Sequence, residues 1–503
     1  MAIKRYFATL DNTITNAFER NLSTRGTGSN MGASDILETF VIHGQTTASI
    51  NAANAEEARI LIQFPVNEIS NDKSSGVIPS SSVKYIFKLF NAPHADTTPR
   101  NFTLDIKAIS KAWSEGTGLD MDEYQDMGTS NWISASSTTG WENQGGDVHD
   151  SPAYTASFDT GLENVEVDIT TLVDQWVNNT KVNYGLLIKH LDTSISGTNG
   201  SLFTKKFFGR NSQFFNYRPV IEARWDSARK DNRANFLLSS SLLPESDNIN
   251  TLFFYNRIRG QLKNIPAVGD GQIFVSLFTA SNSSGVPQGS TINIINESPD
   301  ATALDTVATG GLLVENGVAI TGVYTCSFAC TDTTSTLFDV WFKDDTYHTG
   351  SFSPVSATGS SHDKIQEYVT KITNLKSSYT RNENPRLRLF TREKNWNPNV
   401  YTKVIAEKKP EIIEDAYFSV FRLTDKLNVI PFGTGSADIS NEHTKLSYDV
   451  SGNYFDLDMS MLEEDYGYGI RIAYYLQDAY QIQREIFKFR VERDREWVLK
   501  YEY

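Results

Sequence analysis

The sequence predicts an all-β fold, built as tandem β-sandwiches with an extended N-terminal arm. Apolar and polar residues alternate with a period of two in short runs, for example at 58–64 and 102–109, and clusters of turn-forming residues separate these runs. Aromatic residues make up 12% of the chain, with 29 Phe and 22 Tyr, and such side chains favour strands. At about 150 residues per domain, a chain of 503 residues predicts roughly three domains.

The first 35 residues differ from the rest of the chain. Asp11–Phe18 has the composition of a short capped helix, and the stretch 23–32 is polar and rich in glycine. Neither part provides an apolar core of its own. Two alternatives stay open, a disordered arm and an arm that docks on a neighbouring subunit. We assign residues 1–35 to an N-terminal assembly arm.

Residues 36–230 predict an antiparallel β-sandwich. The runs at 58–64, 83–90, 102–109 and 184–189 alternate between apolar and polar residues, which indicates antiparallel strands in two packed sheets. The stretch 167–177 is an exception. Asp168 is a suitable N-cap, and the apolar residues after it recur at helical spacing, so a short amphipathic helix is predicted there.

Two immunoglobulin-like sandwiches are predicted to follow. A charged connector at 226–233 leads into residues 231–362, where further alternating runs occur. A linker rich in Ser and Gly extends to about residue 363, and residues 363–503 form the last unit. The two units share a short sequence similarity, because an early predicted strand in each ends in Leu-Phe-Thr, at 277–279 and 389–391.

The charge balance argues against nucleic acid as a partner. The chain has 46 basic and 61 acidic residues, whereas a phosphate backbone is bound by an excess of cations. Four arginines cluster between Arg381 and Arg392, and we interpret them as a solvated face, with a local basic patch as the alternative. No apolar run reaches the roughly 20 residues of a membrane span, and no signal-peptide core follows the first residues. Neither a membrane partner nor secretion is therefore expected.

The cysteines predict free thiols. Cys326 and Cys330 are the only two, and four residues apart on one strand they would lie about 13 Å from each other, too far for a disulfide. We expect both to be buried and reduced, which fits assembly in a cytoplasm.

No motif predicts catalysis, a metal or a cofactor. The glycine-rich stretch after Arg25 lacks the lysine and the preceding strand of a phosphate-binding loop, and the seven histidines are scattered. Asp120, Asp122, Glu123 and Asp126 share one loop, which cannot hold the carboxylate spacing that glycoside hydrolysis needs. We interpret this loop as solvated, with a structural calcium ion as the alternative. The chain is therefore predicted to be no enzyme.

Two tryptophans are the candidate binding residues. Trp132 and Trp141 lie in a stretch rich in Ser, Thr and Gly, where they could form an exposed aromatic platform for a sugar ring. The alternatives are local packing and a subunit contact. Trp113 and Trp176 are expected in the core of the first sandwich.

The first sandwich also carries a family resemblance. Four features follow one another: the runs at 59–64 and 83–90, Ala112-Trp-Ser-Glu-Gly-Thr-Gly, Val167-Asp-Ile-Thr-Thr-Leu-Val-Asp-Gln-Trp, and the run at 184–189 before Arg218-Pro-Val-Ile-Glu-Ala-Arg-Trp. In this order they resemble DNRLRE domains, which are similar to carbohydrate-binding modules. The resemblance implies a jelly roll with a surface-associated role and names no single sugar. The usual Trp-Asn after the second feature is blurred, with Asn131-Trp132 in its place.

Both ends of the chain carry a second resemblance. Arg25-Gly-Thr-Gly-Ser-Asn-Met-Gly-Ala-Ser-Asp-Ile-Leu-Glu and His443-Thr-Lys-Leu-Ser-Tyr-Asp-Val-Ser-Gly-Asn-Tyr-Phe resemble virion structural proteins of marine T4-like tailed phages. This implies a particle protein that is assembled in the host cytoplasm. We hypothesise a neck, collar or tail-associated scaffold, with copies of itself and other virion proteins as partners. The alternative is a host-surface carbohydrate-binding protein that acts in adhesion or capsid decoration.

Overall fold

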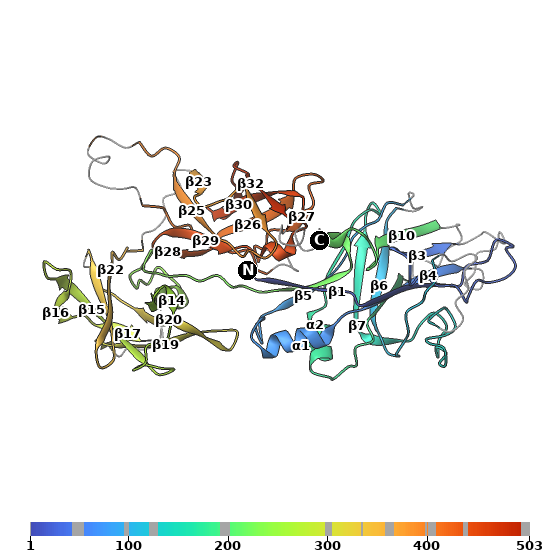
Figure 1. Cartoon of the computed structure of the whole chain (residues 1–503), viewed down its shortest axis with the longest axis horizontal. Coiled ribbons are helices and arrows are strands. Elements are labelled where there is room, and N and C mark those ends of the chain that lie inside the picture. Colours follow the sequence, from blue (N-terminus) through green and yellow to red (C-terminus); the bar gives the residue numbers. More distant parts are fainter. Residues whose placement is uncertain are drawn as a thin grey trace, which may run out of the picture. The chain divides into compact units, whose positions relative to one another are not determined.

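The computed structural model confirms the all-β prediction (Figure 1). It describes residues 2–42, 55–94, 100–119, 129–191, 202–296, 304–332, 335–357, 367–397, 400, 409–435 and 441–493. These residues form antiparallel sheets almost throughout and contain two α-helices, α1 (Val66–Ser74) and α2 (Thr170–Val177). The chain divides into two compact units, one formed mainly by Ala2–Trp225 and the other by most of the residues from Asp226 onward.

The first unit is a sandwich of two sheets. One sheet has the strand order β1 (Ile3–Phe7), β11 (Val220–Arg224), β5 (Lys84–Leu89) and β8 (Val165–Asp168). The other has the order β10 (Leu202–Phe208), β3 (Ile36–Ile42), β4 (Glu56–Gln63), β9 (Leu186–His190), β6 (Phe102–Ile109) and β7 (Val148–Phe158), with β2 (Leu10–Thr15) beside β4. Tyr85 and Phe87 of the first sheet share one core with Ile60 and Ile62 of the second.

A long loop covers the opposite face of the larger sheet. Side chains alternate between the two faces of a strand, so Leu61 points away from the core that holds Ile60 and Ile62. Leu61 and Leu187 pack instead against residues of the 110–147 segment in a second, smaller apolar cluster. Both faces of the middle strands are therefore buried.

The N-terminal segment is part of this sandwich, which corrects the prediction of a separate arm over residues 1–35. β1 pairs antiparallel with β11 from Ile3 opposite Arg224 to Phe7 opposite Val220, and β2 pairs with β4 along its whole length. Asn12 is fully buried and donates from Nδ2 to the Ser130 carbonyl and hydroxyl oxygens at 3.1 and 2.8 Å. Strand pairing and hydrogen bonds of buried polar side chains hold this segment on the sandwich, although it has no apolar face of its own. It therefore folds as strands and not as the predicted short helix and arm.

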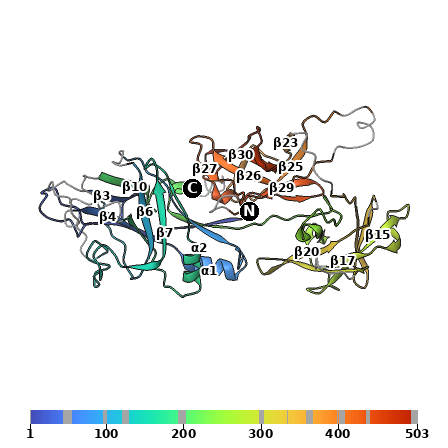
Figure 2. The same cartoon turned by 180° about the vertical axis from the view of Figure 1, so that it is seen from behind.

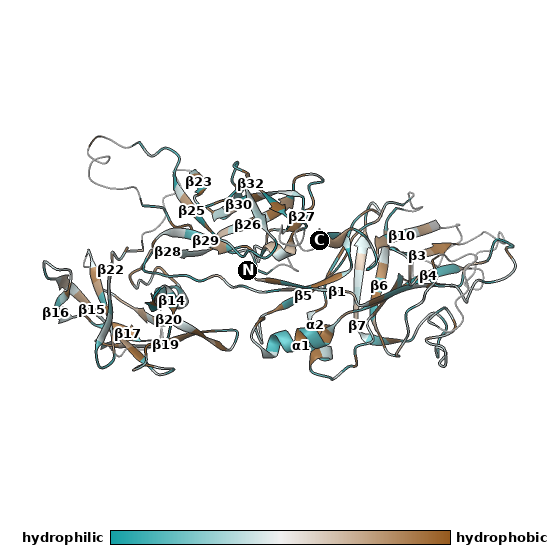
Figure 3. Ribbon diagram, in the orientation of Figure 1, coloured by the Kyte–Doolittle hydropathy of each residue, from teal (hydrophilic) through white to brown (hydrophobic). Residues whose placement is uncertain are grey.

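The two helices lie side by side in both views (Figure 1, Figure 2), and α2 contacts β5. α2 confirms the predicted helix, although it begins at Thr170. Ile169 is at the N-cap position, and Asp168 lies one residue before it. The Asp168 carboxylate accepts a hydrogen bond from the Thr170 backbone N–H at 2.9 Å. α1 was not predicted; it is largely hydrophilic (Figure 3) and buries only Val66 and Ile69. Lys73 of α1 pairs with Asp174 of α2 at 3.4 Å.

β7 is the last strand of the larger sheet. It is 11 residues long and has Pro152 near its middle. Proline has no backbone N–H, so the row of donors along this strand has a gap. Beside it, the Ser151 carbonyl accepts a hydrogen bond from Lys181 Nζ at 2.8 Å.

The second unit begins with a sandwich whose layers share one strand. One layer contains β12 (Asn250–Tyr255), β20 (Val318–Ala329), β17 (Ile294–Asn296) and β18 (Leu304–Asp305); the other contains β16 (Pro287–Thr291), β15 (Ile273–Ser281), β21 (Leu337–Phe342) and β22 (Thr346–Phe352). β19 (Ala308–Glu315) pairs with β15 up to Gly310 and with β20 from Gly311. A small hairpin joins β13 (Arg257–Ile258) to β14 (Gln261–Leu262). Cys326 and Cys330 are buried thiols that form no disulfide, as predicted.

A further sandwich completes this unit. Its sheets have the orders β23 (Tyr368–Ile372), β25 (Arg386–Glu393), β29 (Gly452–Asp456), β28 (Ser447–Asp449), and β24 (Ser378–Thr380), β32 (Phe487–Glu492), β30 (Gly467–Leu476), β26 (Ala416–Arg422), β27 (Asn428–Ile430), with β31 (Ala479–Ile482) beside β30. Phe418 stacks on Phe455 between the sheets, with ring centroids 4.2 Å apart. The boundary predicted at 362–363 lies outside the described residues.

Candidate functional site

Trp132 and Trp141 do not form the exposed platform that was considered for a sugar ring. They are 5% and 8% exposed and belong to the small cluster that covers the larger sheet of the first sandwich. Trp141 Nε1 donates to the Asn131 carbonyl at 2.8 Å, and the Arg59 guanidinium lies 4.6 Å from the Trp132 ring centre. The alternative of local packing describes both residues. Trp113 lies in the same cluster, not in the core between the sheets.

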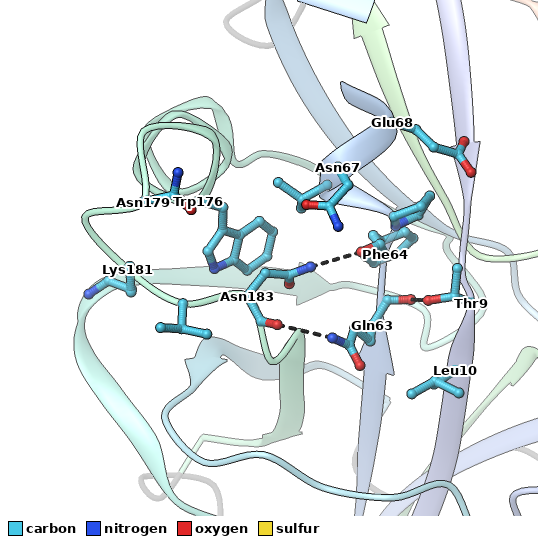
Figure 4. Close-up of a pocket in the computed structure, with 13 residues that line it drawn as sticks. Thr9, Leu10, Gln63, Phe64, Asn67, Glu68, Trp176, Asn179, Lys181 and Asn183 are labelled. Carbon is cyan, nitrogen blue, oxygen red and sulfur yellow. Dashed lines mark hydrogen bonds between the residues drawn. The ribbon is translucent and has the colours of Figure 1, made fainter. Parts of the chain in front are cut away.

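The candidate site is a groove of about 700 Å³ in the first sandwich, drawn in Figure 4. A volume of this size is typical of ligand pockets, which span roughly 300–1,000 Å³. The groove is formed where β4 leads into α1 and where the chain leaves α2. Its lining residues are Thr9, Leu10, Gln63, Phe64, Pro65, Val66, Asn67, Glu68, Trp176, Asn179, Lys181, Val182 and Asn183.

Buried apolar side chains contribute to the wall of the groove. Phe64, Val66 and Trp176 belong to the core between the two sheets and also line the groove. Trp176 comes from the last turn of α2 and is 3% exposed. Its indole Nε1 is buried without a hydrogen-bond partner among the described residues. Because a buried donor usually has a partner, this N–H is an unsatisfied polar group in the wall of the groove.

A hydrogen-bonded frame holds the polar side of the groove in place. Asn183 Nδ2 donates to the Phe64 carbonyl at 2.8 Å, and Gln63 Nε2 donates to the Asn183 carbonyl at 3.0 Å (Figure 4). The Thr9 hydroxyl donates to the Gln63 carbonyl at 3.2 Å. These bonds join β4 to the segment after α2, so the polar wall is preformed.

The outer rim offers groups for recognition. Asn67, Glu68 and Asn179 are exposed, and Figure 4 shows the Asn67 amide near Trp176 and Asn183. Asn179 adopts a positive φ of 55°, a conformation that asparagine tolerates better than most residues. Lys181 is half-buried. The rim thus combines amide donors and acceptors with one charge of each sign.

The groove presents few ionisable groups. Glu68 and Lys181 are the ionisable side chains that line the groove, and the lining includes no Ser, Cys or His nucleophile. Within the described ranges, no three His, Cys, Asp or Glu side chains are grouped as metal ligands, and no helix is long and apolar enough to span a membrane. The acidic residues at 120–126 lie outside the described residues.

Sequence reasoning missed this groove although it placed Trp176 in the core. The lining comes from segments that are distant in sequence, and only the fold brings them together. The one local signal is the asparagine-rich stretch 178–183 directly after an amphipathic helix.

The arginine cluster of the last sandwich is paired, not simply solvated. Arg386 binds Asp456 through two hydrogen bonds of 2.8 and 3.0 Å, and Arg388 binds Asp449 through two of 2.8 and 2.7 Å. Both guanidinium groups also lie over the Tyr454 ring. These two residues therefore form no free basic patch.

A joint connects the two sandwiches of the second unit. Residues 229–231 run parallel to β28: Tyr448 N–H donates to the Arg229 carbonyl at 3.0 Å, and Asp231 N–H donates to the Tyr448 carbonyl at 3.1 Å. Arg229 also forms two hydrogen bonds of 2.5 and 2.6 Å to Glu315, at the end of β19. The connector therefore extends one sandwich and is anchored to the other.

Comparisons with known proteins identify no relative. No family model matches the chain, and no curated protein matches it. Among solved structures, one of the chains that match is Salmonella alpha-2-macroglobulin reacted with methylamine, at 8% identity and a TM-score of 0.15. It covers 97% of this chain and 28% of that chain. A TM-score this low carries no argument about fold or function.

Proposed function

We propose that this chain is a structural component of a tailed bacteriophage virion, most simply a neck, collar or tail-associated scaffold. In this role it would bind copies of itself and other virion proteins in a symmetric assembly. The resemblance of both chain ends to phage structural proteins supports the proposal. The structural observation that supports it is the joint between the last two sandwiches.

The joint suits a scaffold because several kinds of contact limit the movement of the connector between the two sandwiches. Backbone hydrogen bonds add residues 229–231 beside β28, and the buried Tyr448 accepts a further bond at its hydroxyl from Asn232 Nδ2 at 3.1 Å. The Arg229–Glu315 pair fixes the hairpin of β19 and β20 to the same connector. A connector held on both sides sets the spacing of two modules, which flexible linkers do not.

The first test is quantitative mass spectrometry of purified phage particles, in which intact virions are compared with isolated heads and tails. We expect a small fixed copy number that is enriched with the tails. Hundreds of copies on heads would contradict the tail-associated role and indicate capsid decoration. Absence from particles would contradict the structural role altogether.

The groove favours a second candidate function, binding of a host-surface glycan by the first sandwich. Sugar hydroxyls can pair with the exposed amides of Asn67 and Asn179 at the rim of the groove. Carbohydrate ligands suit a site that combines an aromatic ring with a few fixed polar groups. Trp176 replaces Trp132 and Trp141 as the aromatic residue in this hypothesis.

Replacing Asn67 by Ala is expected to weaken glycan binding about five- to tenfold, because one neutral hydrogen bond contributes roughly 1 kcal/mol. Asn71→Ala is the matched control, since Asn71 is exposed on the same helix and does not line the groove. Glycan arrays with the purified chain would identify the ligand, and titration of both variants would measure affinity. Equal loss in the two variants, or no array signal, would exclude the groove as a glycan site.

A further inference from the structure

A buried carboxylate lies where the N-terminal strands pack on the first sandwich. Asp11 of β2 is fully buried. Its Oδ2 accepts the Arg210 backbone N–H at 2.6 Å, and its own N–H donates to Glu115 Oε1 at 2.8 Å. Oδ1 is buried and has no hydrogen-bond partner among the described residues. The side chain is therefore only half satisfied as a carboxylate.

The nearby cation is already engaged. Arg210 donates from Nε and Nη2 to the two oxygens of Glu115, at 2.8 and 2.5 Å. Its Nε lies 3.7 Å from Asp11 Oδ1, beyond hydrogen-bonding distance. The Arg210 guanidinium thus lies near two carboxylates. It is hydrogen-bonded to Glu115, which is the more exposed of the two, with 18% of its side chain exposed. An ionised Asp11 would add a buried negative charge beside Glu115.

The groups that act on Asp11 come from each element packed around it. Glu115 belongs to the loop after β6, and Arg210 belongs to the loop after β10. Asp35, just before β3, contributes its backbone carbonyl, which accepts the Gly209 N–H at 2.7 Å. On the facing strand β4, Asp11 lies opposite Ile62, which is apolar. Arg210 is the only cation of this set within the described residues.

We infer that Asp11 makes the packing of the N-terminal strands sensitive to pH. Its protonated form stabilises the packing of β1 and β2 on the first sandwich, and its ionised form destabilises it. This inference does not depend on the proposed virion role or on the groove. Segments held by polar contacts open locally more easily than an apolar core. β2 is such a segment, because buried polar residues occupy most of it.

The sign of the pH dependence follows from the charge environment. The pKa of Asp11 is raised to about 7, mainly by burial and also by the charge of Glu115, while the backbone N–H and the charge of Arg210 act in the opposite direction. An unfolded or detached Asp11 has the ordinary pKa of 3.8. The docked state therefore binds a proton more tightly. Docking is strongest below about pH 4, weakens as the pH rises, and levels off above about pH 7.

Hydrogen exchange of the full chain tests this inference. After correction for intrinsic exchange, protection of the amides in β1 and β2 is expected to fall at least tenfold between about pH 5.5 and 8. Asp11→Asn should abolish this difference, because an amide does not ionise. Asp105→Asn is the control, since Asp105 is buried in the same sandwich beside Lys107 at 3.7 Å. It should leave the pH response intact.

A second variant keeps the test decisive if Asp11→Asn folds poorly. Glu115→Gln removes the opposing charge and frees Arg210 for Asp11, so the midpoint of the pH response should move down by at least about one pH unit. Protection that does not depend on pH in the unmodified chain would overturn the inference. So would an unchanged pH response in both Asp11→Asn and Glu115→Gln.

Discussion

Replacing Arg233 by Leu is expected to lower the free energy of unfolding of the second sandwich by about 3–5 kcal/mol. Asp339 of β21 is fully buried and accepts hydrogen bonds from Arg233 Nη1 at 2.5 Å and from Trp341 Nε1 at 2.8 Å. Without Arg233, its charge would stay buried with one neutral donor. Gly350 leaves the room that the guanidinium fills, since a Cβ there would lie 2.2 Å from Nη1.

Calorimetry of the full chain measures this effect as a shift of one of its unfolding transitions. Arg257→Leu is the matched control, because Arg257 is exposed in the same sandwich and its loss should change stability by less than about 0.5 kcal/mol. Adding Asp339→Leu to Arg233→Leu should recover part of the stability, since no unpaired charge remains. A loss below about 1 kcal/mol for Arg233→Leu would show that the pair is not the anchor described here.

Glu222→Gln should destabilise the first sandwich by a comparable amount, about 3–5 kcal/mol. Glu222 is 1% exposed on β11 and contacts Arg5 at 2.9 Å, Lys88 at 3.6 Å and Arg224 at 2.6 Å. Burial alone would raise its pKa, yet these three cations hold the pKa well below its usual range. A neutral glutamine would leave Glu166 as the only carboxylate that pairs with Lys88 and Arg224 among the described residues.

Denaturation of Glu222→Gln measures this loss, and Glu68→Gln is the control because Glu68 is exposed in the same unit. The low pKa also fixes the direction of the pH effect. The contribution of Glu222 is present above the ordinary carboxylate pKa of 4.5 and is lost as the pH falls. The difference between Glu222→Gln and the unmodified chain should therefore shrink in acid, and a difference that grows in acid would contradict the network.

Period-two alternation was sufficient to predict the fold class, because it depends on local sequence. β6 illustrates this, since Phe102, Leu104 and Ile106 point into the core and the polar residues between them lie on the other face of the sheet. β2 was not predicted, because Asp11, Asn12 and Thr13 read as turn residues. Their strand is held by partners about 50 to 200 residues away, which no local pattern reveals. α1 was missed because two buried residues make too weak a helical pattern.

The candidate site was less predictable than the fold. The sequence drew attention to Trp132 and Trp141, but their exposure depends on how one loop packs on the outer face of a sheet. Trp176 was correctly expected in the core, and its sequence pattern did not reveal that it also lines a groove. Composition predicts which side chains are able to bind, whereas the fold decides which of them meet.

Pro152 has a consequence for the behaviour of many copies at high local concentration. Strands at the end of a sheet invite pairing with another chain, and such cross-chain pairing leads to aggregation. In β7 the missing N–H interrupts the donors, and Lys181 occupies the carbonyl beside it, so a foreign strand could not pair in register along the whole of β7. Crowded copies of the chain would thus be less able to pair with one another along this edge.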